Sequence, residues 1–357
     1  MDLQRIEQLR QKLHEKEAIA IISPVNRRYY TDFLSSNGML FITKNDTVFY
    51  TDFRYITAAE NVINKDIIVK KFDSTVINTL KNLLSVFKLL YIETTFLTYN
   101  DVANYKKNLE KIELKSIDSE ISSQRMVKDE NEIESIKNAQ KITDSAFVHI
   151  IDFIASKWKN GLSEREIAME IEFFMRRNES GNAAFDVITA SGINSSMPHA
   201  IPTDKKICSG DFITMDFGAT FNGYCSDMTR TVAIEQVSDE QTKIYEIVLT
   251  AQKHALNGIK AGIIGKTGDS LARDYISEKG FGEFFGHSLG HSLGLEIHEN
   301  PNFNTNYDKP IPKNAVMSVE PGIYLPNKFG VRIEDIVVLR ENGIENLTKS
   351  EKKLLIL

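Results

Sequence analysis

The chain contains 357 residues, of which 42% are hydrophobic and 26% are charged, and its formal net charge is −6. This length exceeds one ordinary hydrophobic core and predicts two domains, and the composition is typical of a soluble globular protein. The negative net charge argues against a nucleic-acid-binding surface, which would need a basic patch.

The sequence predicts neither an export signal nor a membrane partner. Charges are scattered through the first 17 residues, unlike the charged-then-apolar layout of a signal peptide. No apolar run approaches the roughly 20 residues that span a bilayer. The only cysteines are Cys208 and Cys225, so no disulfide framework is indicated. We therefore expect a cytoplasmic protein.

The N-terminal region predicts a self-contained α/β domain. Apolar residues at helical spacing favour a helix over residues 2–15, and a strand is expected at Ala18–Ile22. The pattern continues with a hairpin of strands at 38–43 and 47–50, and with strand–helix pairs at 67–72 with 74–87 and at 89–92 with 99–109. Strands that alternate with helices describe one α/β domain. We place this domain at residues 1–124, with its boundary in the polar segment Ser119–Asp129.

Residues 125–357 predict a second domain that begins with helices. Helices are expected at 130–154 and at 163–178, where Ser163 is the N-cap and Glu166 completes a capping box. The remaining expected elements are strands at 185–190, 211–217 and 229–234, helices at 239–259 and 267–279, and then short strands separated by Gly/Pro turns. The expected fold class is therefore α/β (α+β).

Four acids and one histidine in this second region stand in tightly ordered sequence contexts. They are Asp216, Asp227, His291, Glu320 and Glu334. The acids lie beside apolar, strand-like residues, and a buried carboxylate without a partner is very costly. Two divalent metal ions are the simplest means of neutralising four such acids, which indicates a metal-dependent hydrolase.

Local patterns bring two of the acids together. Asp216 ends an apolar run, and the dipeptide Asn222-Gly223 between Asp216 and Asp227 is a strong hairpin-turn signal. A hairpin would place both acids on neighbouring strands, where they would repel each other. Such a pair needs a cation, a shared proton or an exposed location.

The histidines and the remaining acids fit the same site. His287, His291 and His298 lie within twelve residues, among glycines that disfavour a helix and let the backbone approach a ligand closely. Arg332 and Glu334 share one face of a predicted strand. A structural ion pair of Arg332 with Glu334 or with the neighbouring Asp335 is the alternative interpretation.

Oxygen ligands with one imidazole suit several first-row divalent ions. Mn²⁺ is favoured because most of the ligands are hard, while Co²⁺, Zn²⁺ and Fe²⁺ also fit. A water molecule that bridges two such ions ionises readily, and the resulting hydroxide attacks an electrophile at neutral pH. Hydrolysis at a carbonyl or at a phosphoryl centre would use this chemistry equally well.

Five segments, in this order, resemble the creatinase/prolidase family of pita-bread (M24-type) metallopeptidases. They are FDVITASGINSSMPHAIPTDKKI (185–207), DFITMDFGATFNGYCSDMTRT (211–231), GHSLGHSLGLEIHENP (286–301), MSVEPGIYLP (317–326) and GVRIEDIVVL (330–339). The resemblance covers nearly the whole chain. It implies a creatinase-like α/β domain at 1–124, followed by a pita-bread catalytic domain at 125–357.

The resemblance also implies metal-binding roles at the matching positions. Asp216 would bind one ion, His291 and Glu320 would bind the other, and Asp227 and Glu334 would bridge the pair.

Catalytic roles are implied in the same way. His199 and His298 would bind substrate or handle protons beside the scissile carbonyl, and Glu320 would carry a proton. Arg332 would orient Glu334 or contact the substrate.

The activity implied is that of a dinuclear-metal exopeptidase with a metal-bridging hydroxide. It would cleave the Xaa-Pro bond at the N-terminus of peptides or in dipeptides, as an Xaa-Pro aminopeptidase or as an Xaa-Pro dipeptidase (prolidase). Proline-containing peptides are the expected substrates, and a homodimer is the family's usual assembly. A non-catalytic peptide-binding module on the same fold, or another dinuclear-metal amidohydrolase or phosphoesterase, is the alternative.

Overall fold

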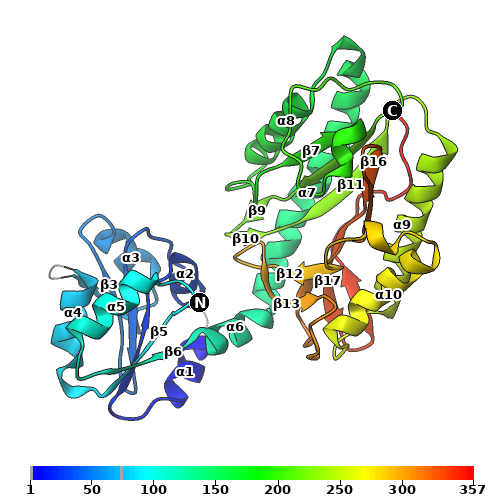
Figure 1. Ribbon diagram of the computed structural model, residues 1–357. Helices are drawn as coiled ribbons and strands as arrows, with labels where there is room; N and C mark the ends of the chain where they lie inside the picture. The colour runs from blue at the N-terminus through cyan, green and yellow to red at the C-terminus, as the bar shows by residue number, and fades with distance from the viewer. Residues whose placement is uncertain (1–2, 73–74) are drawn as a thin grey trace. The chain divides into compact units, whose positions relative to one another are not determined.

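The computed structural model describes residues 3–72 and 75–357, and the chain divides into two compact units, Met1–Arg125 (unit 1) and Met126–Leu357 (unit 2). Both units combine helices with strands (Figure 1), which confirms the expected α/β (α+β) class. Residue 2 and Ser74, the expected starts of two helices, lie outside the described residues.

Unit 1 is built on one sheet with helices on both faces. Its helices are α1 Gln4–Gln11, α2 Pro24–Thr31, α3 Ile56–Val62, α4 Val76–Leu83, η1 Leu84–Val86, α5 Tyr99–Asn108 and α6 Asp118–Met126. Its strands are β1 Glu17–Ile21, β2 Met39–Thr43, β3 Thr47–Thr51, β4 Ile68–Lys71, β5 Leu89–Ile92 and β6 Glu113–Ser116. The sheet order is β4-β3-β2-β1-β5-β6, with antiparallel pairing around β2 and parallel pairing toward both edges.

The core of unit 1 follows from strand alternation. Leu80 of α4 and Tyr105 of α5 pack in one apolar cluster with Ala18, Ala20 and Leu90 of the central strands. Side chains of successive strand residues point to opposite faces, and α1 contacts the sheet at β2. The two faces are thus covered by different helices (Figure 1).

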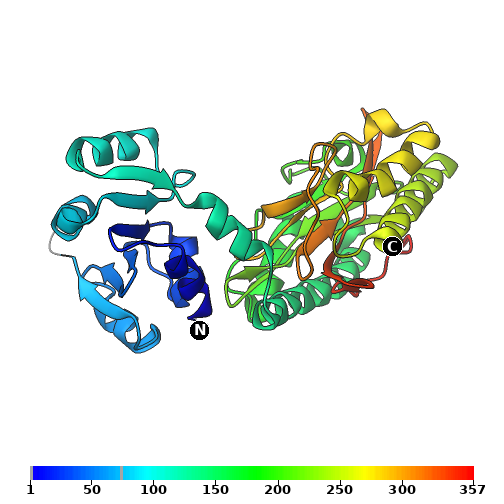
Figure 2. The same cartoon turned by 90° about the horizontal axis from the view of Figure 1, so that it is seen from below.

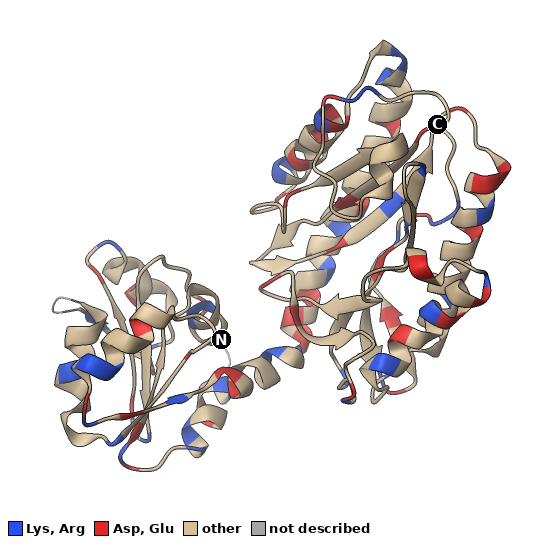
Figure 3. Ribbon diagram, viewed as in Figure 1, with Lys and Arg blue, Asp and Glu red and all other residues tan. Residues whose placement is uncertain are grey.

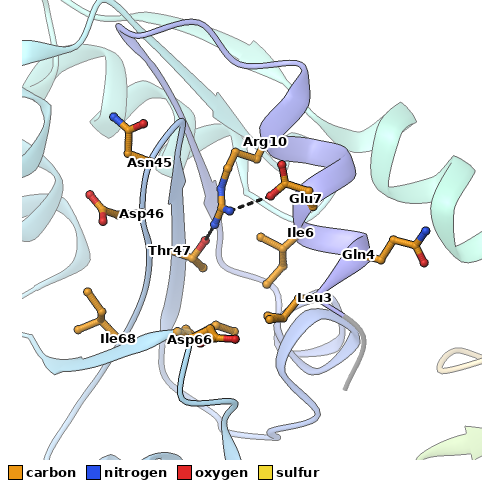
Figure 4. A pocket seen from close by; sticks show the side chains of 11 residues that line it. Leu3, Gln4, Ile6, Glu7, Arg10, Asn45, Asp46, Thr47, Asp66 and Ile68 are labelled. Carbon is orange, nitrogen blue, oxygen red and sulfur yellow. Dashed lines mark hydrogen bonds and ion pairs between the residues drawn. The ribbon is translucent and has the colours of Figure 1, made fainter.

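A surface pocket of about 540 Å³ opens in unit 1 between α1, the β2–β3 turn and the start of β4. Figure 4 shows Arg10 pointing into it, where the guanidinium donates to Glu7 Oε2 at 2.8 Å and to Thr47 Oγ1 at 2.7 Å. The acids Asp46 and Asp66 also line the pocket. Its charged groups therefore partly satisfy one another.

Unit 2 begins with two long helices and continues with two helix–strand blocks. Its helices are α7 Glu130–Lys157, η2 Trp158–Asn160, α8 Glu164–Arg177, η3 Gly192–Ser196, α9 Asp239–Gly258, α10 Gly265–Glu278 and η4 Gly282–Phe284. Its strands are β7 Ile188–Ser191, β8 Phe212–Phe217, β9 Thr220–Phe221, β10 Tyr224–Cys225, β11 Met228–Ala233, β12 Gly290–Ser292, β13 Glu299–Phe303, β14 Val316–Val319, β15 Gly322–Leu325, β16 Phe329–Arg332, β17 Asp335–Arg340 and β18 Gly343–Asn346. The predicted capping box of α8, with Ser163 and Glu166, is confirmed.

Each helix pair of unit 2 covers its own sheet. The first sheet has the order β11-β8-β7, and the second has the order β13-β12-β14-β17-β18. Buried residues of α7 and α8, such as Ile150 and Ile171, pack with Met215 of the first sheet. Val248 of α9 packs in a separate cluster with Met317 of the second sheet. Figures 1 and 2 show α9 and α10 side by side outside the strands, which leaves the inner faces of the two sheets for a site.

Charge is distributed evenly over the helices. Figure 3 shows acidic and basic residues interspersed along the helices of both units. Within the described residues, no helix is long and apolar enough to cross a bilayer.

One expected strand is interrupted. The prediction that Arg332 and Glu334 share a continuous strand is wrong, because β16 ends at Arg332 and β17 begins at Asp335. β16 pairs with β15 in a separate ribbon, whereas β17 pairs with β14 in the second sheet. The chain passes from the β15–β16 ribbon to the second sheet at Ile333 and Glu334. The direction of the Glu334 side chain is therefore not set by the alternation of side chains along either strand.

Candidate metal centre

A hairpin presents the first two acids, as predicted from the Asn222-Gly223 dipeptide. Asn222 and Gly223 have φ values of 47° and 75°, the positive values that tight hairpin turns require. Beyond the turn, β11 pairs antiparallel with β8, and Thr229 lies opposite Asp216. Asp227 directly precedes β11, so both carboxylates lie at the same end of the first sheet.

His291 lies on β12, and Glu320 directly follows β14, the adjacent strand of the second sheet. Ser318 links them: its hydroxyl accepts from the backbone N–H of His291 at 3.0 Å and donates to Glu320 Oε1 at 3.1 Å. Gly290 permits this closeness, because a Cβ there would lie 2.0 Å from the carbonyl oxygen of Ser318. The sequence predicted that glycines beside the histidines let the backbone approach a ligand closely; at Gly290 the close approach is to the neighbouring strand.

The side chains converge between the two sheets of unit 2. Ligand atoms of Asp227, His291 and Glu334 all lie within 4.8 Å of one another. His291 Nε2 lies 3.7 Å from Asp227 Oδ2 and 3.4 Å from Glu320 Oε1. Its Nδ1 faces the carbonyl oxygen of Ser292 at 3.2 Å. A proton on Nδ1 would leave Nε2 with a lone pair toward the acids.

Several buried carboxylate oxygens in this cluster have no hydrogen-bond partner among the described residues. They are Oδ1 of Asp216, Oδ1 of Asp227 and Oε1 of Glu334. Buried polar atoms are nearly always paired, and an unpaired buried charge is very unfavourable. Each of the three atoms therefore needs a positive partner, and the described residues do not supply one.

The pKa values of the clustered side chains reflect the same excess of buried negative charge. Burial, followed by the charges of the neighbouring acids, raises the pKa of Asp227 and of Glu334 well above their ordinary values. Burial also raises the pKa of Glu320 to about 7, and it lowers the pKa of His291. A bound cation reverses the shifts of the three acids by favouring ionised carboxylates, and it reinforces the shift of His291 by favouring a neutral imidazole. The residues present thus fit divalent metal ions.

Arg332 lies fully within the protein and acts on Asp216. Its Nη2 donates to Asp216 Oδ2 at 2.7 Å, which directs the unpaired Oδ1 toward the cluster. Its Nε donates to Thr229 Oγ1 at 2.9 Å, and that hydroxyl donates to Glu334 Oε2 at 2.7 Å. Arg332 thus orients Asp216 directly and reaches Glu334 only through Thr229, while Asp335 pairs with Arg230 instead.

Sequence reasoning missed two polar partners of Arg332. The hydroxyl of Tyr324 accepts from Arg332 Nη1 at 2.7 Å and lies 2.9 Å from His287 Nε2. Burial, followed by the charge of Arg332, lowers the pKa of His287 to about 4, so this imidazole is neutral. Thr229 was missed as well. The signals were present as polar residues inside apolar strands, but their partners lie far away in the sequence.

The structure brings His298 and His199 to the edge of the cluster. The rings of His291 and His298 lie 4.5 Å apart at their centroids. Burial, together with nearby His291 and His199, lowers the pKa of His298. Both His199 and His298 are exposed, unlike the five candidate ligands. They therefore border the cluster on a side that solvent or substrate can reach.

Comparison with known proteins identifies the family of the chain. The model of metallopeptidase family M24 matches residues 134–341, and that of the creatinase/prolidase N-terminal domain matches residues 5–127. The chain belongs to metallopeptidase family M24. An Xaa-Pro dipeptidase of Pyrococcus furiosus is 40% identical over 357 residues, which cover 99% of each chain.

Solved structures agree with this membership over the full length. The chain is similar to an Xaa-Pro dipeptidase from Bacillus anthracis, with a TM-score of 0.93, 40% identity and 99% of both chains covered. It is also similar to an X-Pro aminopeptidase from Thermotoga maritima, with a TM-score of 0.90, 39% identity and 99% and 100% coverage. This M24 chain is a metal-dependent peptidase, and the family implies divalent metal ions.

Proposed function

We propose that this chain is a dinuclear-metal exopeptidase that hydrolyses the bond between a first residue and proline. The observation that carries the proposal is the group of unpaired buried oxygens on Asp216, Asp227 and Glu334, together with the ligand atoms of Asp227, His291 and Glu334 that lie within 4.8 Å of one another. Relatives named Xaa-Pro dipeptidase, at up to 40% identity, support proline as the second residue.

The family resemblance implies the ligand arrangement, and burial and contacts are consistent with it. Asp227 and Glu334 lie most deeply within the cluster and would bridge two ions. Asp216, held by Arg332 through one oxygen, would bind one ion, while His291 and Glu320, 3.4 Å apart, would bind the other. We favour Mn²⁺ because four of the five ligands are carboxylates.

Two bound divalent ions would supply a water ionised at neutral pH and a positive field for the substrate carbonyl and amino group. Glu320 would pass a proton to the proline nitrogen. His298 would donate an N–H to the oxygen that gains charge. His199 would act beside it on the same exposed edge.

The test is proline release by the purified protein. After removal of bound metal, addition of Mn²⁺ should give activity on Ala-Pro but not on Ala-Ala or on p-nitrophenyl phosphate. Comparison of Ala-Pro with Ala-Pro-Ala then separates a dipeptidase from an aminopeptidase. We favour the dipeptidase because two relatives that are 40% and 36% identical carry that name. Hydrolysis of the phosphate ester alone would overturn the proposal.

A pair of matched variants tests the metal site itself. Asp227→Asn should abolish both bound metal and turnover, because Asp227 is buried in the cluster. Asp274→Asn, on the exposed face of α10, is the control and should change neither. Full activity of a metal-free Asp227→Asn protein would contradict the metal-dependent mechanism. Bound metal without any peptidase activity would favour a peptide-binding module. Light scattering tests the expected homodimer.

A further inference from the structure

The loop that carries His199 has little hydrophobic burial of its own. It consists of residues 191–203 (the His199 loop), with η3 as its only regular element. Ile193, Met197 and Ile201 are 50%, 51% and 82% exposed. Burial of apolar side chains is the usual force that orders a segment against its conformational entropy. Other interactions must therefore hold this loop.

A buried carboxylate supplies them. Glu164, in the first turn of α8, is 0% exposed. Its two oxygens accept from the backbone N–H and hydroxyl of Ser191, from Nδ2 of Asn194, which donates to both oxygens, and from the backbone N–H and hydroxyl of Thr203, at 2.6–3.1 Å. All the acceptor positions of one carboxylate are thus used by the His199 loop.

These contacts clamp the loop at its entry, its middle and its exit. Ser191 is the last residue of β7, and Thr203 lies beside α8, where its carbonyl accepts from the backbone N–H of Arg165. Between them, Gly192 turns the chain with a φ of 51°, a conformation that L side chains rarely adopt. The carbonyl of Pro198 accepts from Arg332 at 3.2 Å. His199 therefore follows a carbonyl that is itself tied to the metal cluster.

Helix capping does not explain why Glu164 is buried. The N-terminus of α8 is already capped by Ser163 and Glu166, which exchange hydrogen bonds as a capping box. The hydrogen-bond partners of Glu164 among the described residues are uncharged, so they offset the desolvation of a carboxylate through dipoles alone. A group with this cost and no role in the helix serves the loop.

We propose that Glu164 is a positioning residue for peptide hydrolysis, which acts by fixing the loop so that His199 meets the substrate in one place. This inference rests on the proposed function for the role of His199. The organisation of the loop by Glu164 stands on its own contacts. None of the hydrogen bonds of Glu164 among the described residues goes to a candidate metal ligand, so its effect should reach the reaction through the His199 loop.

The test compares Glu164→Gln with Glu166→Gln, the same substitution two residues further along α8. A carboxamide offers one acceptor oxygen in place of two and turns an N–H₂ toward the loop's donors. We expect kcat/KM on Ala-Pro to fall about 10- to 100-fold, since misplacement of a catalytic group by about 1 Å costs on the order of 100-fold. Bound metal should be unchanged, and Glu166→Gln should retain the activity of the unmodified protein.

A double-mutant cycle with His199→Ala distinguishes positioning from general destabilisation. If Glu164 acts through His199, Glu164→Gln in the His199→Ala background should have almost no further effect. Losses that multiply in the double variant, or a Glu164→Gln protein as active as Glu166→Gln, would overturn the proposal. Asn194→Ala, which removes only the mid-loop contact, should give a smaller loss in the same cycle if Glu164→Gln folds poorly.

Hydrogen exchange separates this inference from the proposed function. Amides of residues 191–203 should exchange faster in Glu164→Gln than in Glu166→Gln, whether or not the protein cleaves Ala-Pro. Unchanged exchange across the loop would refute the clamp. An unmodified protein that is inactive on Ala-Pro, combined with faster exchange in Glu164→Gln, would refute the proposed function and leave the clamp in place.

Discussion

The hydroxyl of Thr229 is the sharpest point at which to test how the metal site is built. It donates to Glu334 Oε2 at 2.7 Å and accepts from Arg332 Nε at 2.9 Å, so it joins a candidate bridging ligand to the buried guanidinium. Thr229→Val keeps the shape of the side chain and removes both contacts. Each hydrogen bond to a charged group contributes about 1.5–3 kcal/mol.

The expected consequence is weaker metal binding without loss of the fold. Loss of a partner that orients a ligand typically lowers metal affinity about 10- to 100-fold, which corresponds to about 1.4–2.8 kcal/mol. Competition of Thr229→Val with a chelator for Mn²⁺ gives the affinity directly. Turnover at saturating metal should recover most of its value, because every ligand is still present.

Thr189→Val is the matched control for this experiment. Thr189 is a fully buried threonine on β7 of the same sheet, separated from β11 by β8, and its hydroxyl finds no hydrogen-bond partner among the described residues. Its replacement removes an unsatisfied polar group and should leave metal affinity unchanged with equal or higher stability. An affinity of Thr229→Val within about threefold of the unmodified protein, or an equal loss in Thr189→Val, would refute the role given to Thr229.

Two further predictions concern pH and close packing. Because burial raises the pKa of Glu320 from 4.5 to about 7 in the metal-free protein, protonation of this carboxyl stabilises the fold fully below about pH 4.5, and the contribution is lost as pH rises through about 7. The gain in Tm on adding Mn²⁺ should therefore grow across that window, and a gain independent of pH would contradict it. Gly290→Ala should destabilise by about 1–3 kcal/mol in denaturant unfolding, because its Cβ would lie 2.0 Å from the carbonyl oxygen of Ser318. Gly286→Ala, with nothing within 4 Å, should not.

Features set by local sequence could be predicted, and one available signal was overlooked. The Asn222-Gly223 turn and the α8 capping box depend on residues within a few positions of each other, and both are confirmed. Helix α2 was not predicted, although Ser23 caps it and Pro24 occupies its first turn, a recognised start signal. The helix is short, and its few apolar residues give a weaker helical pattern than the strand patterns on either side.

Contacts set by register between distant strands could not be predicted. Thr229 meets Glu334 only because β11 and the break before β17 lie side by side, 105 residues apart in sequence. Tyr324, on β15, also meets a residue of a separate element, because His287 lies before β12. The break at Ile333 was hidden because apolar residues continue on both sides of it. Which hydroxyl serves which ligand therefore depends on the packed structure.

The crowding of acids between the two sheets has a consequence for how such a scaffold can change over time. Without metal, mutual repulsion and burial make the charged forms of Asp227, Glu320 and Glu334 unfavourable. The metal-free centre therefore lowers the stability of the fold, and a bound ion restores it. Neutral substitutions there should leave a metal-free chain that is sturdier than its parent. One substitution would then both abolish catalysis and raise the stability of the metal-free protein. A stable protein without peptidase activity could therefore evolve from this fold in a single step.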